Sequence, residues 1–197
     1  MGRSRSRPLR RLAILGTITW AVLLASAFTF STDDRADFAT RQTARVAVLY
    51  WAIAVGSMLA FASPTQTSRW FWSLGAMAFA VHVATAFATI HLWSHESAFA
   101  HVESVSGFGP GIFVSYAFTA IWMADAGWWW IDPSSYEARP RRWTIALHSF
   151  MAFIIFNGTV VYEVGWVRWA SALVFGVLGV LLALRSARLR GIDRYQG

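Results

Sequence analysis

LAILGTITWAVLLASAFTFST, residues 12–32, contains no Asp, Glu, Lys or Arg and is predominantly apolar. A helix of about 20 such residues crosses the hydrocarbon core of a bilayer. Two further stretches without formal charge, residues 46–68 and 143–162, have the same character. These stretches predict an all-α protein, a polytopic bundle of transmembrane helices.

The composition of the whole chain supports this class. Of 197 residues, 56% are hydrophobic and 14% are charged, and the mean hydropathy is +0.45. A soluble domain is nearer a quarter charged, so the composition argues against a soluble enzyme and against a disordered chain. The chain has no cysteine, which excludes disulfides, thiolate metal sites and a cysteine nucleophile.

Six apolar stretches are long enough to span a bilayer, and we expect helices at about 12–31, 46–63, 70–91, 111–131, 143–162 and 165–184. The expected organisation is an arginine-rich cytoplasmic head (1–11), a six-helix transmembrane domain (12–184) and a basic cytoplasmic tail (185–197). A cleaved signal peptide is the alternative for the first stretch. That stretch exceeds the 7–15 apolar residues of a usual signal core, however, and no soluble domain follows it.

The distribution of arginine predicts the orientation. All 17 basic residues are arginine, and cytoplasmic loops of membrane proteins have an excess of basic residues. With both termini in the cytoplasm, 13 arginines fall on the cytoplasmic side; Arg35, Arg41, Arg45 and Arg168 fall on the other. We therefore expect both termini to be cytoplasmic and the protein to lie in the inner (cytoplasmic) membrane. The net charge of +7 reflects this topology, and no nucleic-acid partner is expected.

A stretch rich in histidine and glutamate follows the third expected span, on the non-cytoplasmic face. On a continuous helix His91 and His95 are about 40° apart and share a face; His101, Glu96 and Glu103 lie close by in the sequence. Imidazole and carboxylate ligands without thiolate suit zinc, copper or iron. These five residues predict a divalent transition-metal site, which could serve membrane redox chemistry. The alternatives are a solvated polar loop and a pH-sensing cluster.

Three more ionisable side chains fall inside the expected spans, where they are energetically costly. Asp125 and His148 lie at matching depth on helices joined by a short cytoplasmic turn, so we expect them to face the interior and interact. His82 lies near the middle of its span, and we expect a neutral imidazole hydrogen-bonded to a neighbouring helix. A haem b ligand is the alternative for His82, although His148 lies about 10 Å away in depth at 1.5 Å per residue. On the last span, Gly176 and Gly179 predict close helix packing.

Residues 82–130, with HLWSH and SYAFTAIWMADAGWWW, resemble a set of small, functionally uncharacterised bacterial multi-pass membrane proteins. The resemblance covers about a quarter of the chain and implies no activity or site residue. Three classes of function remain. The first is a metal-binding or redox protein. The second is a proton- or solute-translocating protein that uses Asp125, His148 and His82. The third is an accessory structural subunit of a larger membrane complex.

Overall fold

The computed structural model describes residues 6–29, 34–61 and 65–195, and over these ranges the chain is helical and forms no strand. The elements are α1 (Ser6–Thr29), α2 (Arg35–Ala60), α3 (Gln66–Thr89), α4 (His95–Ser106), α5 (Gly111–Ile131), α6 (Pro133–Ala138), α7 (Arg141–Phe156), the π-helical η1 (Asn157–Val161) and α8 (Gly165–Tyr195). The all-α class is therefore confirmed.

Five helical segments are long and apolar enough to cross a membrane: α1, α2, α3, α7 with η1, and α8. Helices α4 and α5 pass the same test only as a pair, bent by 107°, which raises the number to at most six within the described residues. Helix α5 has the bounds expected for the fourth span. The last residues of the expected spans 12–31 and 46–63 lie outside the described residues.

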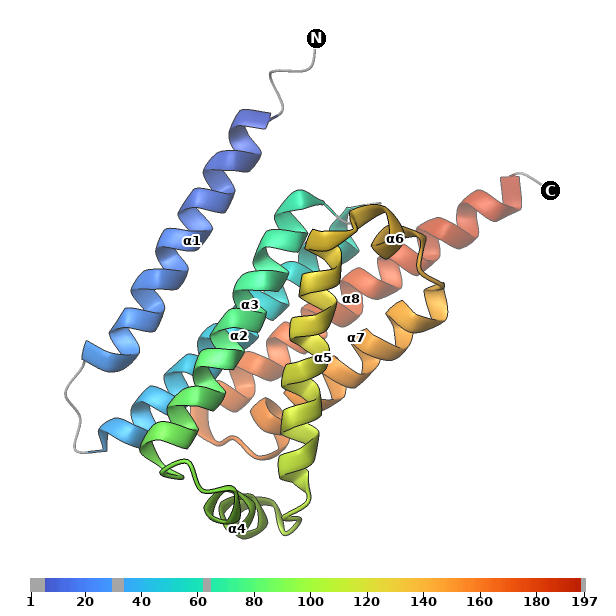
Figure 1. Cartoon of the computed structure of the whole chain (residues 1–197). Helices are drawn as coiled ribbons and strands as arrows, with labels where there is room; N and C mark the ends of the chain where they lie inside the picture. Colours follow the sequence, from blue (N-terminus) through green and yellow to red (C-terminus); the bar gives the residue numbers. More distant parts are fainter. Residues whose placement is uncertain (1–5, 30–33, 62–64, 196–197) are drawn as a thin grey trace.

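The six long helices run up and down between two ends of the molecule (Figure 1). The start of α1 and the end of α8, which are the two termini of the described chain, lie at one end together with α6, and α4 lies across the opposite end. Helices α2 and α3 form the central pair. Helix α1 packs on both of them, α5 packs on α3, and α8 packs on α2.

Small residues allow the central pair to approach closely. Ala54 on α2 and Ala78 on α3 have no exposed surface. A Cβ atom added at Gly75 would lie 2.7 Å from Cζ2 of Trp122 and 3.3 Å from the backbone nitrogen of Trp51. Glycine at this position therefore lets the Trp122 ring and the α2 backbone come into contact with α3.

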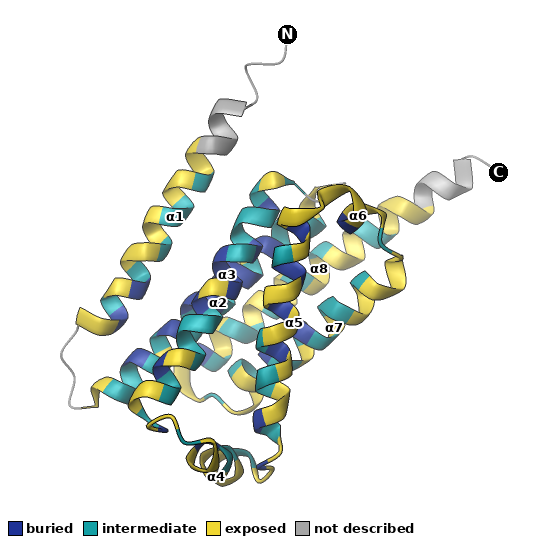
Figure 2. Cartoon of the chain, in the orientation of Figure 1, coloured by how far each residue is buried: buried dark blue, intermediate teal, exposed yellow. Residues whose placement is uncertain are grey.

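The outer helices expose apolar surface, as helices facing lipid do (Figure 2). Buried residues concentrate on α2 and α3, whereas Val22 on α1 and Leu173 on α8 are 62% and 69% exposed. Gly176 and Gly179 also lie on an open face of α8, because a Cβ at either would meet no atom within 4 Å. Within the described chain these two glycines do not pack against another helix, contrary to the expectation from sequence.

Candidate functional site

A buried cluster of charged and aromatic groups lies at the end of the bundle that holds both termini. Asp125 comes from α5, Tyr136 from α6, and Arg139 directly follows α6. Arg139 Nη1 donates to Asp125 Oδ1, and the Tyr136 hydroxyl donates to Asp125 Oδ2 at 3.1 Å. The Arg139 and Asp125 side chains are only 6% and 7% exposed. Both carboxylate oxygens are therefore occupied inside the protein.

Aromatic contacts fix the position of this cluster. The Tyr136 ring stacks on Trp129 with centroids 4.5 Å apart, and the Arg139 guanidinium lies 3.9 Å from the Tyr136 ring centroid. Arg139 Nε also donates to Thr144 Oγ1 on α7 at 3.0 Å. Burial and the neighbouring Asp125 raise the pKa of the Tyr136 phenol, which therefore remains protonated and donates. The cluster connects α5, α6 and α7.

The local sequence explains why the chain turns back here. Asp132 caps α6 by accepting a hydrogen bond from the Ser135 amide at 3.0 Å, and Pro133 occupies the first helical turn. Both residue types are typical of helix starts. Bonds from the Ser134 hydroxyl and the Ser135 amide lower the pKa of Asp132. The short helix places Arg139 close enough to reach Asp125.

The structure pairs Asp125 with Arg139 and not with His148. The His148 ring lies edge-on to Trp72, with centroids 5.2 Å apart, and its buried Nδ1 has no hydrogen-bond partner in the described chain. The sequence analysis did not predict Arg139 as the partner of Asp125. It treated this arginine only as one of the basic residues that mark the cytoplasmic side. The Asp132–Pro133 helix start was the available signal that the loop folds back.

His82 links α3 to α2. Its Nδ1 donates to the carbonyl oxygen of Thr40 at 2.9 Å, and the acceptor fixes the proton on Nδ1 because a carbonyl cannot donate. This geometry agrees with a neutral histidine bonded to a neighbouring helix. His148, the other candidate haem ligand, does not face His82, because its ring packs against Trp72.

Packed aromatic rings connect His82 to His148. Neighbouring centroids lie 5.2–6.0 Å apart along the series His82, Phe79, Trp122, Trp72 and His148. The Trp72 and Trp122 indole nitrogens are buried without hydrogen-bond partners in the described chain. The space between the two histidines is therefore filled by rings and contains no chain of side-chain hydrogen bonds.

The predicted metal ligands at the opposite end do not converge. His91 is 6% exposed and its ring lies 5.3 Å from that of His101, whereas His95 Nδ1 is 2.9 Å from the hydroxyl of Tyr116. No group of three His, Asp or Glu side chains in the described ranges could hold a metal ion, so Glu96 and Glu103 complete no site. Burial, and secondarily His101, lower the pKa of His91.

The backbone explains this outcome. The expected HxxxH face requires one helix through positions 91 and 95, but α3 ends at Thr89 and α4 begins at His95. Between them Leu92 and Trp93 have positive φ angles of 48° and 60°, which turn the chain sharply. His91 and His95 therefore belong to different segments, and metal binding by all five residues lacks geometric support.

The fold and these contacts define a class: a helical bundle with five or six helices able to cross a membrane, and with a buried ion pair between Asp125 and Arg139. No protein-family model, curated protein or solved structure matches the chain. The resemblance to bacterial multi-pass proteins stays a prediction, and the function is inferred from this chain's own residues.

Proposed function

We propose that this chain is a six-span integral membrane protein of the inner membrane, with both termini in the cytoplasm, and that it acts as an accessory structural subunit of a larger membrane complex. The supporting observation is that the interior side chains of Asp125 and His82 are used to hold helices together. Asp125 accepts a hydrogen bond from Tyr136, and His82 donates one to the carbonyl oxygen of Thr40.

The same use of polar groups extends to the edges of the bundle. Arg41 on α2 pairs with Asp37 at 2.7 Å and with Glu163, before α8, at 3.5 Å. At the other end Arg185 of α8 donates to the Met58 carbonyl of α2. These contacts join α2 to the α8 region at both ends, which is the behaviour of structural clamps.

A translocation pathway receives less support from the interior. Proton or solute transfer through His82, His148 and Asp125 needs polar groups or water between them, and packed rings occupy the route from His82 to His148. Asp125 is ion-paired with Arg139, so it is not the free carboxylate that a proton carrier needs.

Three measurements test this proposal against its rivals. Purified protein in liposomes containing a pH-sensitive dye should show the same proton flux as empty liposomes, and the protein should contain substoichiometric metal. In native gels of gently solubilised membranes, the chain should migrate with a second polypeptide, well above its own 22.0 kDa. Proton flux above that of empty liposomes, or migration as this chain alone, would contradict the proposal.

One observation favours a second candidate, a transition-metal site at the α4 end. The His91 and His101 rings are adjacent, and the buried His91 Nδ1 lacks a partner among the described residues. Two imidazoles supply half of a tetrahedral zinc shell. Zinc titration of the purified protein tests this candidate: His101→Ala should weaken binding, whereas His95→Ala, whose imidazole is bonded to Tyr116, should not. Equal effects of the two variants on zinc binding would exclude a metal site at His91 and His101.

A further inference from the structure

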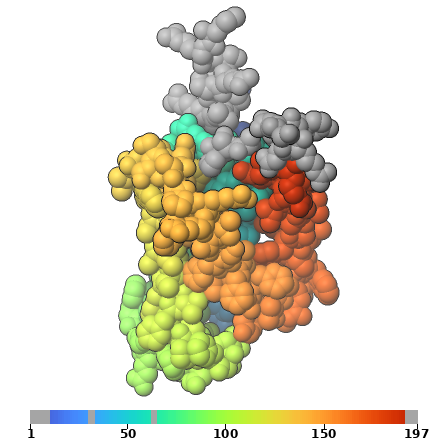
Figure 3. All heavy atoms as spheres, turned by 90° about the vertical axis from the view of Figure 1, so that its right-hand side faces the viewer, coloured from blue at the N-terminus to red at the C-terminus, as the bar shows by residue number. Residues whose placement is uncertain are grey.

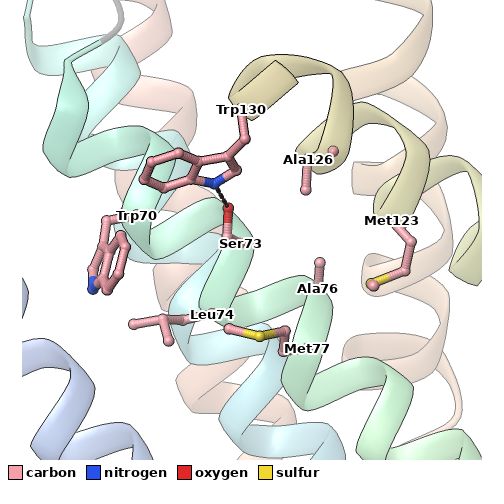
Figure 4. Close-up of a pocket in the computed structure, with 9 residues that line it drawn as sticks. Trp70, Ser73, Leu74, Ala76, Met77, Met123, Ala126 and Trp130 are labelled. Carbon is pink, nitrogen blue, oxygen red and sulfur yellow. Dashed lines mark hydrogen bonds between the residues drawn. The ribbon is translucent and has the colours of Figure 1, made fainter.

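We propose that a surface groove between α1, α3 and α5, at the end holding both termini, binds an acyl chain of a phospholipid with an anionic headgroup. The groove has two adjoining parts that share Trp70. The first, about 270 Å³, lies between α3 and α5, and the second, about 370 Å³, lies along α1. Figure 4 shows Trp130 at one end of the first part, with Met77 and Met123 farther along it.

The polar atoms in the walls are already bonded within the protein. Ser73 Oγ accepts a bond from Trp130 Nε1 at 2.8 Å and donates to a carbonyl one turn earlier in α3. Thr17 Oγ1 likewise accepts from Trp70 Nε1 at 2.9 Å and donates to a carbonyl in α1. The surface left to a ligand consists of methyl, thioether and ring carbon groups, which suits an acyl chain and not a polar solute.

An acyl chain is flexible and has no hydrogen-bonding groups, so it matches walls whose polar atoms are already bonded within the protein. Trp70 forms a wall of both parts of the groove.

Two arginines lie where the headgroup would be. The Arg69 guanidinium is 4.0 Å from the Trp130 ring centroid and donates once, to the Trp129 carbonyl at 3.1 Å. Its Nε is buried and out of reach of a ligand, but a guanidinium has five N–H donors and the bond to Trp129 uses one of them. Arginine near the membrane surface attracts anionic lipid.

The second arginine belongs to α1. At 100° per residue Arg11 shares a face with Ile14 and Ile18, which line the α1 part of the groove, and its side chain is exposed. Arg69 and Arg11 therefore place positive charge at the terminal ends of both parts, which favours an anionic headgroup over a zwitterionic one.

Native mass spectrometry of the protein, released from nanodiscs of equal phosphatidylglycerol and phosphatidylcholine, tests this inference. The unaltered protein should retain at least one phosphatidylglycerol per chain, several-fold more often than phosphatidylcholine. Gly127→Leu should abolish retention, because Gly127 lines the groove and a Cβ there meets no atom within 4 Å. The matched control is Gly176→Leu, equally open but on α8. Met77→Trp fills the groove from its other wall and serves as a second test.

The charge is tested separately. Arg11→Gln should reduce the preference for phosphatidylglycerol, whereas Arg188→Gln, also exposed but on α8, should not. Equal retention of the two lipids by the unaltered protein would overturn the inference, as would Gly127→Leu retaining lipid as well as Gly176→Leu. A polypeptide in the groove in place of lipid would also overturn it. The place of the headgroup depends on the proposed membrane orientation. Lipid retention is measured independently of partner migration, so the two proposals can fail separately.

Discussion

Arg139 determines how a carboxylate can be buried in this protein. Asp125 lies in a predominantly apolar helix, and Arg139 together with Tyr136 occupies both of its oxygens. A buried charge that loses its partner is strongly destabilising, because neither water nor another charge replaces the lost interaction. The stability of this end of the bundle should therefore depend on the whole cluster.

We predict that Asp125→Asn and Arg139→Gln each lower the free energy of unfolding by about 3–5 kcal/mol, since each leaves a buried charge unpaired. The measurement is chemical unfolding in detergent, followed by tryptophan fluorescence. Asp37→Asn is the control, because it breaks the pair of Asp37 and Arg41, whose side chains are 46% and 52% exposed. Exposed pairs contribute about 0–1 kcal/mol. Equal effects of Asp125→Asn and Asp37→Asn would show that the cluster is not a clamp.

At this scale the sequence identified the costly residue but not its partner. Asp125 stands out because an acid inside an apolar stretch needs compensation. Its partner depends on the path of the loop at 132–140, and apolar periodicity contains no information about that path. The sequence predicted that His82 would bond to a neighbouring helix. It did not predict that the acceptor would be the carbonyl oxygen of Thr40.

Among the elements, the long helices were the most predictable. The apolar length that a bilayer requires identifies them, and α5 begins and ends at the expected residues. The sharp turn after α3 could not be predicted, because Leu92 and Trp93 are not residues that favour positive φ. That turn separates His91 from His95 and removes the expected metal-binding face.

The contact between α2 and α3 depends on Gly75. We predict that Gly75→Ala destabilises the bundle by about 1–3 kcal/mol, because the added methyl group overpacks the contact with Trp122 and the α2 backbone. Thermal unfolding in detergent measures the effect. Gly176→Ala, where the methyl group would meet open space, should cause no loss of stability. A harmless Gly75→Ala would contradict the close approach of these helices.

Helix α6 should respond to acid through its capping residue. The folded pKa of Asp132 is lower than the unfolded value, so the cap stabilises α6 above the ordinary aspartate pKa of about 3.9. This contribution is lost as the pH falls through the lower, folded pKa. An NMR titration of the Ser135 amide should have a midpoint below about 3.9, and Asp132→Asn should abolish the transition. A midpoint above that value would contradict the capping geometry.

For the whole molecule, the position of charge agrees with the arrangement of the helices. Arg11 lies near the start of α1, Arg69 near the start of α3, Arg139 directly after α6, and Arg185 in the C-terminal part of α8. These ends of the helices lie at the same end of the bundle (Figure 1). In Figure 3 the gold surface around α6 lies toward the top and the yellow-green surface around α4 toward the bottom. Apolar side chains cover the outer faces of α1 and α8, which a bilayer would surround. The arginine-rich end should therefore face the cytoplasm, and α4 should lie on the other side.

Cysteine accessibility in intact cells tests this arrangement most directly, because the natural chain has no cysteine. Ser104 on α4 and Ser134 on α6 are both exposed and lie at opposite ends of the bundle. A membrane-impermeant maleimide should label Ser104→Cys from outside and should reach Ser134→Cys only after the cells are permeabilised. Labelling of Ser134→Cys in intact cells, with Ser104→Cys protected, would contradict the proposed orientation, and labelling of both would contradict a membrane-spanning bundle.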